Sequence, residues 1–274
     1  MRIGIFDSGF GGLTVYGKVR EKLPRHDYLY LGDNARTPYG SRSFEAILKF
    51  TTEGVEYLFS QDCQIIVIAC NTASAKALRT LQQRLLPIKY PDRRILGIIR
   101  PSAEALAKHP AGSRVALWAT EGTVRSDSYA LELAKLAPEL KLVQLPCPML
   151  VPLIESGELS GPGLEYFLNR YWKETLALTP RVDSLLLTCT HYPLLHSAIR
   201  KMVPAETEIL IQGDLVAPSL ADYLRRHPEI ESRLSKNGTE RFLTTDQTEG
   251  FDRLATRFLG RAVTADRVEM QAVP

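Results

Sequence analysis

The stretch DCQIIVIACNTASAKAL, residues 62–78, has a counterpart later in the chain, DSLLLTCTHYPLLHSAI, residues 183–199. In both, an aspartate precedes an apolar run, and the run ends at a cysteine, Cys70 or Cys189, just before a helix-like pattern. Apolar runs that are continuous rather than alternating are typical of strands buried on both faces of a parallel sheet. Two such units predict two similar lobes, although two short segments can also match by chance.

The rest of the chain alternates in the same way between short apolar runs and helical patterns. This alternation predicts an α/β fold of two similar lobes, each a mostly parallel sheet flanked by helices. We expect the first lobe, with Cys70, to comprise residues 1–97 plus 210–274, and the second, with Cys189, residues 98–209. The expected strands are 2–7, 26–33, 63–70, 93–99, 114–119, 140–145, 184–189, 207–212 and 241–245. The expected helices are 11–23, 43–59, 71–85, 101–109, 121–136, 163–178 and 192–203.

Composition excludes several classes of protein. The chain has 274 residues, with 34 Lys and Arg against 31 Asp and Glu, and a net charge of +3 argues against nucleic acid or a membrane surface as partner. No apolar segment approaches the roughly 18–20 residues of a membrane helix, and the N-terminus shows no signal peptide. We therefore expect a cytoplasmic protein with its four cysteines reduced.

Cys70 and Cys189 both lie where a strand is expected to give way to a helix. In α/β sheets, ligands bind beyond the carboxyl ends of the strands. The positive end of a helix stabilises a thiolate, so we expect the pKa of these thiols to be lowered. Either cysteine alone could be a small core residue. Two equivalent junctions favour chemistry, whereas Cys63 and Cys147 lack this setting and are expected to be core residues.

Two further loops are expected at the same edge of the sheet. DSGFGG, residues 7–12, could hold a carboxylate on its N–H groups while Asp7 takes a cation, or it could be a turn capped by Asp7 or Ser8. It matches neither GxGxxG nor a P-loop. In GDNARTPYG, residues 32–40, we expect Tyr39 to face the ligand.

Three kinds of chemistry could use the cysteines. The spacing of Cys189 and His191 does not suit a zinc site, so no metal is expected. A Cys189–His191 hydrolase leaves Cys70 without a role. Two thiols across a cleft predict stereoinversion, in which one thiolate removes a proton from carbon and the other thiol returns one to the opposite face. The sequence offers no convincing lysine for pyridoxal phosphate, so no cofactor is expected.

At these residues the sequence resembles the glutamate racemases, the cofactor-independent members of the aspartate/glutamate racemase family. The resemblance spans nearly the whole chain and rests on GIFDSGFGGLTV (4–15), GDNARTPYG (32–40), ACNTASA (69–75), ATEGTVRS (119–126), VPLIESG (151–157), CTHYPLL (189–195) and FDRLATRFLG (251–260). It implies that the chain interconverts L- and D-glutamate for peptidoglycan in a cleft between the lobes, and that it forms a homodimer. A racemase for aspartate or another amino acid, and a non-catalytic amino-acid-binding protein, remain alternatives.

The resemblance also implies roles for individual residues. Cys70 would act on the D-isomer and Cys189 on the L-isomer, with Asp7, Glu155 and His191 tuning proton transfer. The implied substrate-binding residues are Asp7, Ser8, Pro38, Tyr39, Gly40, Asn71, Thr72, Thr120, Thr190 and His191.

Three residues depart from the pattern of that family. Thr188 stands where glycine is usual before CTHYP, Asn34 where Thr or Ser is common, and Gln212 where serine is usual. None removes a catalytic group, so we expect them to affect affinity and rate and not reaction class. The chain begins almost at its first strand, without the extension of members that a cell-wall precursor activates, so no such activator is expected.

Overall fold

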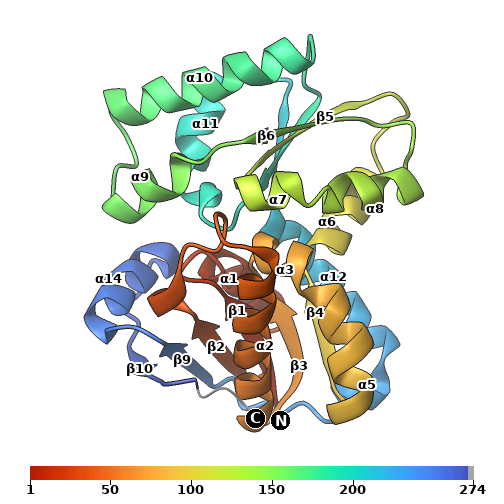
Figure 1. Cartoon of the computed structure of the whole chain (residues 1–274), viewed down its shortest axis with the longest axis vertical. Helices are drawn as coiled ribbons and strands as arrows, with labels where there is room; N and C mark the ends of the chain where they lie inside the picture. The colour runs from red at the N-terminus through yellow and green to blue at the C-terminus, as the bar shows by residue number, and fades with distance from the viewer. Residues whose placement is uncertain (271–274) are drawn as a thin grey trace.

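The apolar runs of the sequence form two separate parallel sheets in the computed structural model, which describes residues 1–270. Each sheet is the centre of one lobe, and the two lobes lie one above the other in Figure 1. The first sheet has the order β10-β9-β2-β1-β3-β4. Its strands are β1 Arg2–Asp7, β2 Tyr28–Gly32, β3 Cys63–Ile68, β4 Arg94–Gly97, β9 Glu240–Thr244 and β10 Ala265–Arg267.

The second sheet repeats the topology of the first. Its order is β6-β5-β7-β8, and its strands are β5 Arg114–Ala119, β6 Lys141–Pro146, β7 Ser184–Thr188 and β8 Glu208–Ile211. In the first lobe β1 pairs with β2 on one side and β3 on the other, and β4 lies beyond β3. In the second lobe β5 pairs with β6 and β7 in the same way, and β8 lies beyond β7. Cys70 and Cys189 each follow the third strand, which confirms the prediction of two similar lobes.

Helices cover both faces of the first sheet. Successive residues of a strand point to opposite faces, so Ile3 and Ile5 pack in one core and Phe6 in the other. The core around Ile3 and Ile5 also receives residues of α1, α12 and α14, and the core around Phe6 receives residues of α2 and α3. The helical segments of this lobe are α1 Leu13–Lys22, η1 Asn34–Arg36, α2 Phe44–Ser60, α3 Asn71–Lys76, α4 Leu78–Thr80, η2 Leu81–Leu85, α5 Leu86–Lys89, α12 Gln212–Arg226, α13 Pro228–Glu231 and α14 Thr248–Leu259.

The second sheet is covered in the same way, with α10 and α11 on one side and α8 on the other (Figure 1). The helical segments of this lobe are α6 Ile99–Leu106, α7 Glu121–Arg125, α8 Ser128–Leu136, α9 Leu150–Ser156, α10 Pro162–Leu178, η3 Tyr192–Leu195 and α11 His196–Met202. Among the described residues, no helix combines the length and the apolar character that crossing a membrane requires.

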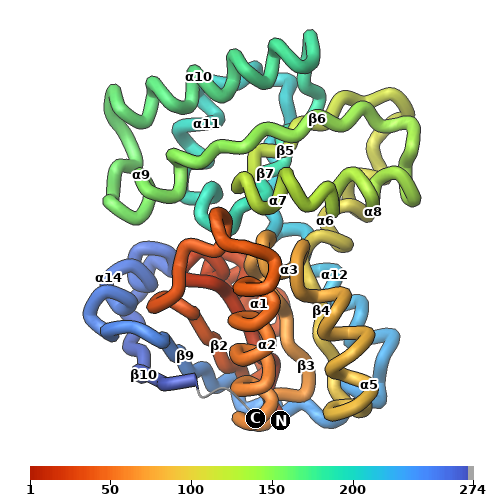
Figure 2. Tube along the Cα trace, viewed as in Figure 1, coloured from red at the N-terminus to blue at the C-terminus, as the bar shows by residue number. Residues whose placement is uncertain are grey.

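The chain passes between the lobes twice. It leaves the first sheet after β4 and returns after β8, so that the red-to-yellow and blue segments of Figure 2 together form the lower lobe. The second sheet ends at Ile211, two residues beyond the expected boundary at 209. The returning helix α12 packs against α1.

Three expected helices differ from those observed. The helix expected at 121–136 is divided by Asp127, whose φ of 51° is left-handed, into α7 and α8. The helix expected at 192–203 begins with a 3₁₀ turn, η3. Residues 71–85 form several short segments that include a π-helical turn, η2, instead of one regular helix. Helix α9 was not predicted because its seven residues are too few to show a period.

Candidate active site

A small cavity lies between the lobes, at the carboxyl ends of the strands of both sheets. Its volume is about 40 Å³. Eleven of the residues implied by the resemblance line it: Ser8, Pro38, Tyr39, Gly40, Cys70, Asn71, Thr72, Thr120, Cys189, Thr190 and His191. Thr37 and Val151 also line it and were not predicted. Asp7 and Glu155 do not line it and instead contact the residues around it.

Cys70 caps the N-terminus of α3. Its Sγ accepts hydrogen bonds from the backbone N–H of Ala73 at 3.5 Å and from the hydroxyl of Ser8 at 3.4 Å. Both bonds favour a thiolate, but burial outweighs them and raises the pKa of Cys70 to about 12, with the charge of Asp7 adding to the increase. The expectation of a lowered pKa is therefore wrong for Cys70, because burial disfavours its thiolate more than the N-terminus of α3 and Ser8 favour it.

Cys189 contacts an imidazole that is itself paired with a carboxylate. Its Sγ lies 3.9 Å from Nδ1 of His191, and Nε2 of His191 lies 3.1 Å from Oε1 of Glu155. Burial lowers the pKa of His191, but the hydrogen bonds to Cys189 and Glu155 outweigh burial and raise this pKa to about 10. His191 is consequently an imidazolium at neutral pH. The ring of Phe258, from α14 of the other lobe, meets it edge-on at 5.7 Å between centroids.

Asp7 is fully buried behind the cavity. One oxygen, Oδ2, accepts a hydrogen bond from the N–H of Gly9 at 2.9 Å, whereas Oδ1 has no partner among residues 1–270. Burial raises the pKa of Asp7, and the charge on His191 and the N–H groups of Gly9 and Gly12 oppose the increase. A buried carboxylate oxygen without a partner is costly, so this position favours a cationic ligand group.

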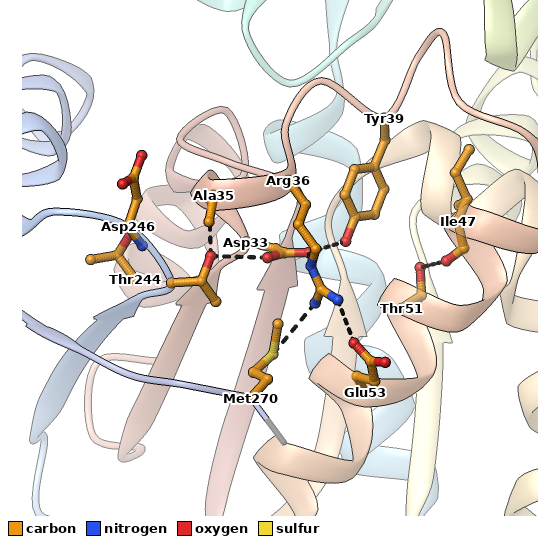
Figure 3. A network of polar contacts seen from close by, with 11 residues as sticks. Asp33, Ala35, Arg36, Tyr39, Ile47, Thr51, Glu53, Thr244, Asp246 and Met270 are labelled. Carbon is orange, nitrogen blue, oxygen red and sulfur yellow. Dashed lines mark hydrogen bonds and ion pairs between the residues drawn. The ribbon is translucent and has the colours of Figure 1, made fainter. Parts of the chain in front are cut away.

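Tyr39 lines the cavity, but its hydroxyl is engaged by a residue outside the cavity wall. It donates to Asp33, and the same carboxylate accepts from Arg36 Nε at 2.8 Å and from Thr245 Oγ1 at 2.9 Å (Figure 3). Arg36 also pairs with Glu53 of α2. Tyr39 is therefore an anchor that fixes the loop at 37–40 against the first lobe, a role that sequence reasoning missed because Asp33 was not singled out.

Contacts between the lobes close the rim of the cavity. The hydroxyl of Thr14 donates to the carbonyl of Thr190 at 2.9 Å, and the hydroxyls of Thr72 and Thr120 lie 3.0 Å apart. A Cβ on Gly11 would lie 2.3 Å from Thr190 Oγ1. Small residues at the rim thus allow the two lobes to approach closely.

Two of the departures from the family pattern have structural explanations. Thr188 is buried and donates to the carbonyl of Trp118 on the neighbouring strand at 2.8 Å. Asn34 accepts from the hydroxyl of Thr244 at 3.0 Å. Both side chains are therefore bound within a lobe and do not line the cavity.

Other features of the molecule lie apart from this cavity. All four cysteines are free and buried, and Cys63 and Cys147 do not line it. A larger cavity of about 730 Å³, near α6, α8 and α12, has no cysteine in its walls. Over residues 1–270, no three metal-ligating side chains come together.

Comparisons with known proteins agree on one family. The model of the family described as Asp/Glu/Hydantoin racemase matches residues 3–217. The glutamate racemase of Paracoccus denitrificans is 39% identical over 270 residues, which cover 94% of this chain and 97% of that protein. A glutamate racemase isoform from Bacillus anthracis superimposes with a TM-score of 0.89 at 32% identity, covering 98% of this chain and 97% of the other. The glutamate racemase of Francisella tularensis, solved with D-glutamate, gives a TM-score of 0.87 at 29% identity, covering 99% and 98%.

Proposed function

The chain belongs to the Asp/Glu/Hydantoin racemase family, and we propose that it is a glutamate racemase that uses two cysteines and no cofactor. The observation that carries this proposal is the shared cavity: Cys70 and Cys189, each after the third strand of its lobe, line it together. The enzyme interconverts L- and D-glutamate and supplies D-glutamate for peptidoglycan. The hydrolase alternative is not favoured, because it gives Cys70 no role.

In this proposal the two thiols exchange protons with opposite faces of the substrate. For L-glutamate, the thiolate of Cys189 takes the Cα proton, and the thiol of Cys70 gives its proton to the other face. For D-glutamate the two roles are reversed. General acid–base catalysis contributes about 10²- to 10⁴-fold, and orientation in a closed site must supply much of the remaining acceleration.

The surroundings of the two thiols differ. This difference supports a state in which Cys70 is the proton donor and Cys189 is the base that receives the Cα proton of L-glutamate. Burial and Asp7 keep Cys70 as a neutral thiol, ready to donate. The imidazolium of His191, 3.9 Å from Cys189 Sγ, carries a charge that neutralises a thiolate there. Glu155 in turn holds that imidazolium in place, as a partner of His191 that does not line the cavity.

Asp7 has a second role in the proposal. Its Oδ1, buried behind the cavity and without a partner among the described residues, would stabilise the ammonium group of the substrate by its charge. That positive charge would offset the effect of Asp7 on Cys70 and ease removal of the proton from that thiol. Ser8, Pro38, Tyr39, Gly40, Asn71, Thr72, Thr120 and Thr190 complete the substrate-binding set.

The relatives' names support glutamate as the substrate, and the Francisella tularensis enzyme was solved with D-glutamate. We further propose a homodimer in the cytoplasm. Sedimentation equilibrium of the purified protein tests the dimer, and a monomer at micromolar concentration contradicts it.

The experiment follows each glutamate enantiomer by chiral chromatography with purified protein and no added cofactor. Racemisation of both enantiomers is expected, with aspartate turned over far more slowly. The Cys70→Ala, Cys189→Ala double variant should be inactive, whereas Cys63→Ala, at a buried cysteine outside the cavity, should retain activity. A wild-type protein that leaves both glutamate enantiomers unchanged contradicts the function. Full activity in the double variant contradicts the two-thiol chemistry.

A further inference from the structure

Gln212 is buried at the point where the chain returns from the second lobe to the first, as the first residue of α12. Its side-chain amide forms a reciprocal pair with Asn71: the Nδ2 of Asn71 donates to Oε1 of Gln212, and Nε2 of Gln212 lies 3.1 Å from Oδ1 of Asn71. Asn71 is the first residue of α3 and follows Cys70 directly. The returning segment is thus connected to the start of the helix that Cys70 caps.

The pair extends into the second lobe through two hydroxyls. The hydroxyl of Tyr129, on α8, donates to Oδ1 of Asn71 at 2.8 Å and accepts from Nε2 of Gln212 at 2.7 Å. The hydroxyl of Ser102, on α6, lies 3.1 Å from the same nitrogen and donates to the carbonyl of Ile98 at 2.8 Å. Four buried side chains from both lobes therefore form one connected network.

This network occupies the side chain of Asn71. Its Oδ1 accepts two hydrogen bonds and its Nδ2 donates one, all to residues away from the cavity wall. Asn71 also brings to the cavity its backbone at the N-terminus of α3, where N–H groups lack helical partners. A side chain held at both of its polar ends fixes the backbone that carries it.

We propose that Gln212 is a positioning residue that, through Asn71, sets the place of Cys70 relative to the second lobe. The inference rests on the proposed function for its kinetic test and deepens it. The hydrogen bonds of this network do not involve Cys189, whose Sγ neighbours His191. Loss of Gln212 should therefore affect proton transfer at Cys70 more than proton transfer at Cys189.

An overall rate cannot show this difference. The two enantiomers have equal free energy, so the equilibrium constant is one, and any variant lowers kcat/KM by the same factor in both directions. The isotope effect of a Cα deuterium can show the difference, because the label is transferred to Cys70 from D-glutamate and to Cys189 from L-glutamate. Slowing only the Cys70 step raises the isotope effect on kcat/KM for D-glutamate and lowers it for L-glutamate.

The test compares Gln212→Met with the wild-type protein, because methionine matches glutamine in length without its polar atoms. We expect kcat/KM to fall by about 10- to 100-fold, the cost of a misplaced catalytic group. The ratio of the two isotope effects should shift in the direction given by Cys70→Ser and opposite to that given by Cys189→Ser. An unchanged ratio, or a shift in the Cys189→Ser direction, overturns the proposal.

Two more variants separate positioning from loss of stability. Tyr129→Phe breaks the same network as Gln212→Met. The double variant should therefore lower kcat/KM by less than the product of the two single-variant factors. Thr175→Val removes a buried hydroxyl that accepts from Trp118 Nε1 at 2.9 Å and does not line the cavity, and it should lower the Tm without changing the isotope ratio. A ratio that shifts equally in Thr175→Val overturns the proposal.

A second measurement does not depend on racemisation. The alkylation rates of Cys70 and Cys189 with iodoacetamide are compared by peptide mapping in the wild-type protein and in Gln212→Met. A wild-type protein that fails to racemise glutamate contradicts the proposed function alone, and this ratio then decides the positioning role. We expect the Cys70 rate to change relative to the Cys189 rate, and equal ratios in the two proteins overturn the inference.

Discussion

Replacing Glu155 with glutamine should lower the pKa of His191 and make the enzyme lose activity at a lower pH. The structure joins Nε2 of His191 to Oε1 of Glu155 at 3.1 Å, and this contact helps to raise the pKa of His191 to about 10. Glutamine keeps the size of the side chain but removes its charge. The imidazolium then loses the carboxylate that stabilises it, while its contact with Cys189 remains.

The size of the effect follows from the distance and the exposure of Glu155. Two opposite charges 4 Å apart near a protein surface attract by about 4 kcal/mol, which corresponds to about three pKa units. The side chain of Glu155 is 30% exposed, so solvent screens part of this attraction. We therefore expect the pKa of His191 to fall by about one to two units, to a value of about 8 to 9.

The direction of the pH dependence follows from the sign of the shift. A histidine whose folded pKa is raised keeps its charge up to that pKa, and its contribution to stability is lost as pH rises from about 6.5 through the folded value. In the wild-type protein this loss occurs up to about pH 10. In Glu155→Gln it should be complete at a lower pH, with the alkaline fall in kcat/KM shifted by the same one to two units.

The assay is an NMR titration of the histidine ring protons, with His191 assigned from the signal missing in His191→Gln. The chain has five histidines, so the signals can be resolved. Glu158→Gln removes a charge from an exposed residue near α9 and serves as the control that should leave the His191 midpoint unchanged. A wild-type midpoint near 6.5, or an equal midpoint in Glu155→Gln, refutes the reasoning.

Two further predictions concern the rim of the cavity. Gly11→Ala should lower kcat/KM by more than about tenfold, because its Cβ would lie 2.3 Å from Thr190 Oγ1 and force the lobes apart. Gly163→Ala, where a Cβ meets nothing within 4 Å, should leave kcat/KM unchanged. Equal kinetics in the two variants contradict this account. Tyr39→Phe should lower the free energy of unfolding by about 1.5–3 kcal/mol, since the buried carboxylate of Asp33 loses a hydrogen bond, and urea titration that finds no loss contradicts the anchoring role.

The sequence predicted most of what local pattern can determine. Continuous apolar runs such as residues 184–188 revealed both sheets, and the equivalent places of Cys70 and Cys189 revealed the two-lobed plan. Each of these signals lies within about ten consecutive residues, where periodicity and turn chemistry act. Ser8, Cys70 and Cys189 were accessible for the same reason, because each lies just beyond the end of a strand. Pro38 and Thr120 were expected only from the family resemblance.

What the sequence could not predict depends on groups that meet only in the folded chain. The pKa of Cys70 is raised because the folded chain buries the thiol, and no local pattern reports that burial. The hydroxyl of Tyr39 turns to Asp33, six residues earlier in the same motif, and no periodicity within the motif reports that contact. The sequence marks Gln212 only as a departure from the family pattern, because its hydrogen-bond partner Asn71 is 141 residues away.

The most direct test of the two-thiol account is the position of deuterium early in the reaction of unlabelled L-glutamate in D₂O. A thiol carries one proton, so a thiolate that takes a proton from L-glutamate can return only that proton, while the opposite thiol delivers deuterium to form the product. We predict that the first D-glutamate formed carries deuterium at Cα and that the remaining L-glutamate does not. Deuterium that enters the remaining L-glutamate as fast as D-glutamate forms would contradict the account.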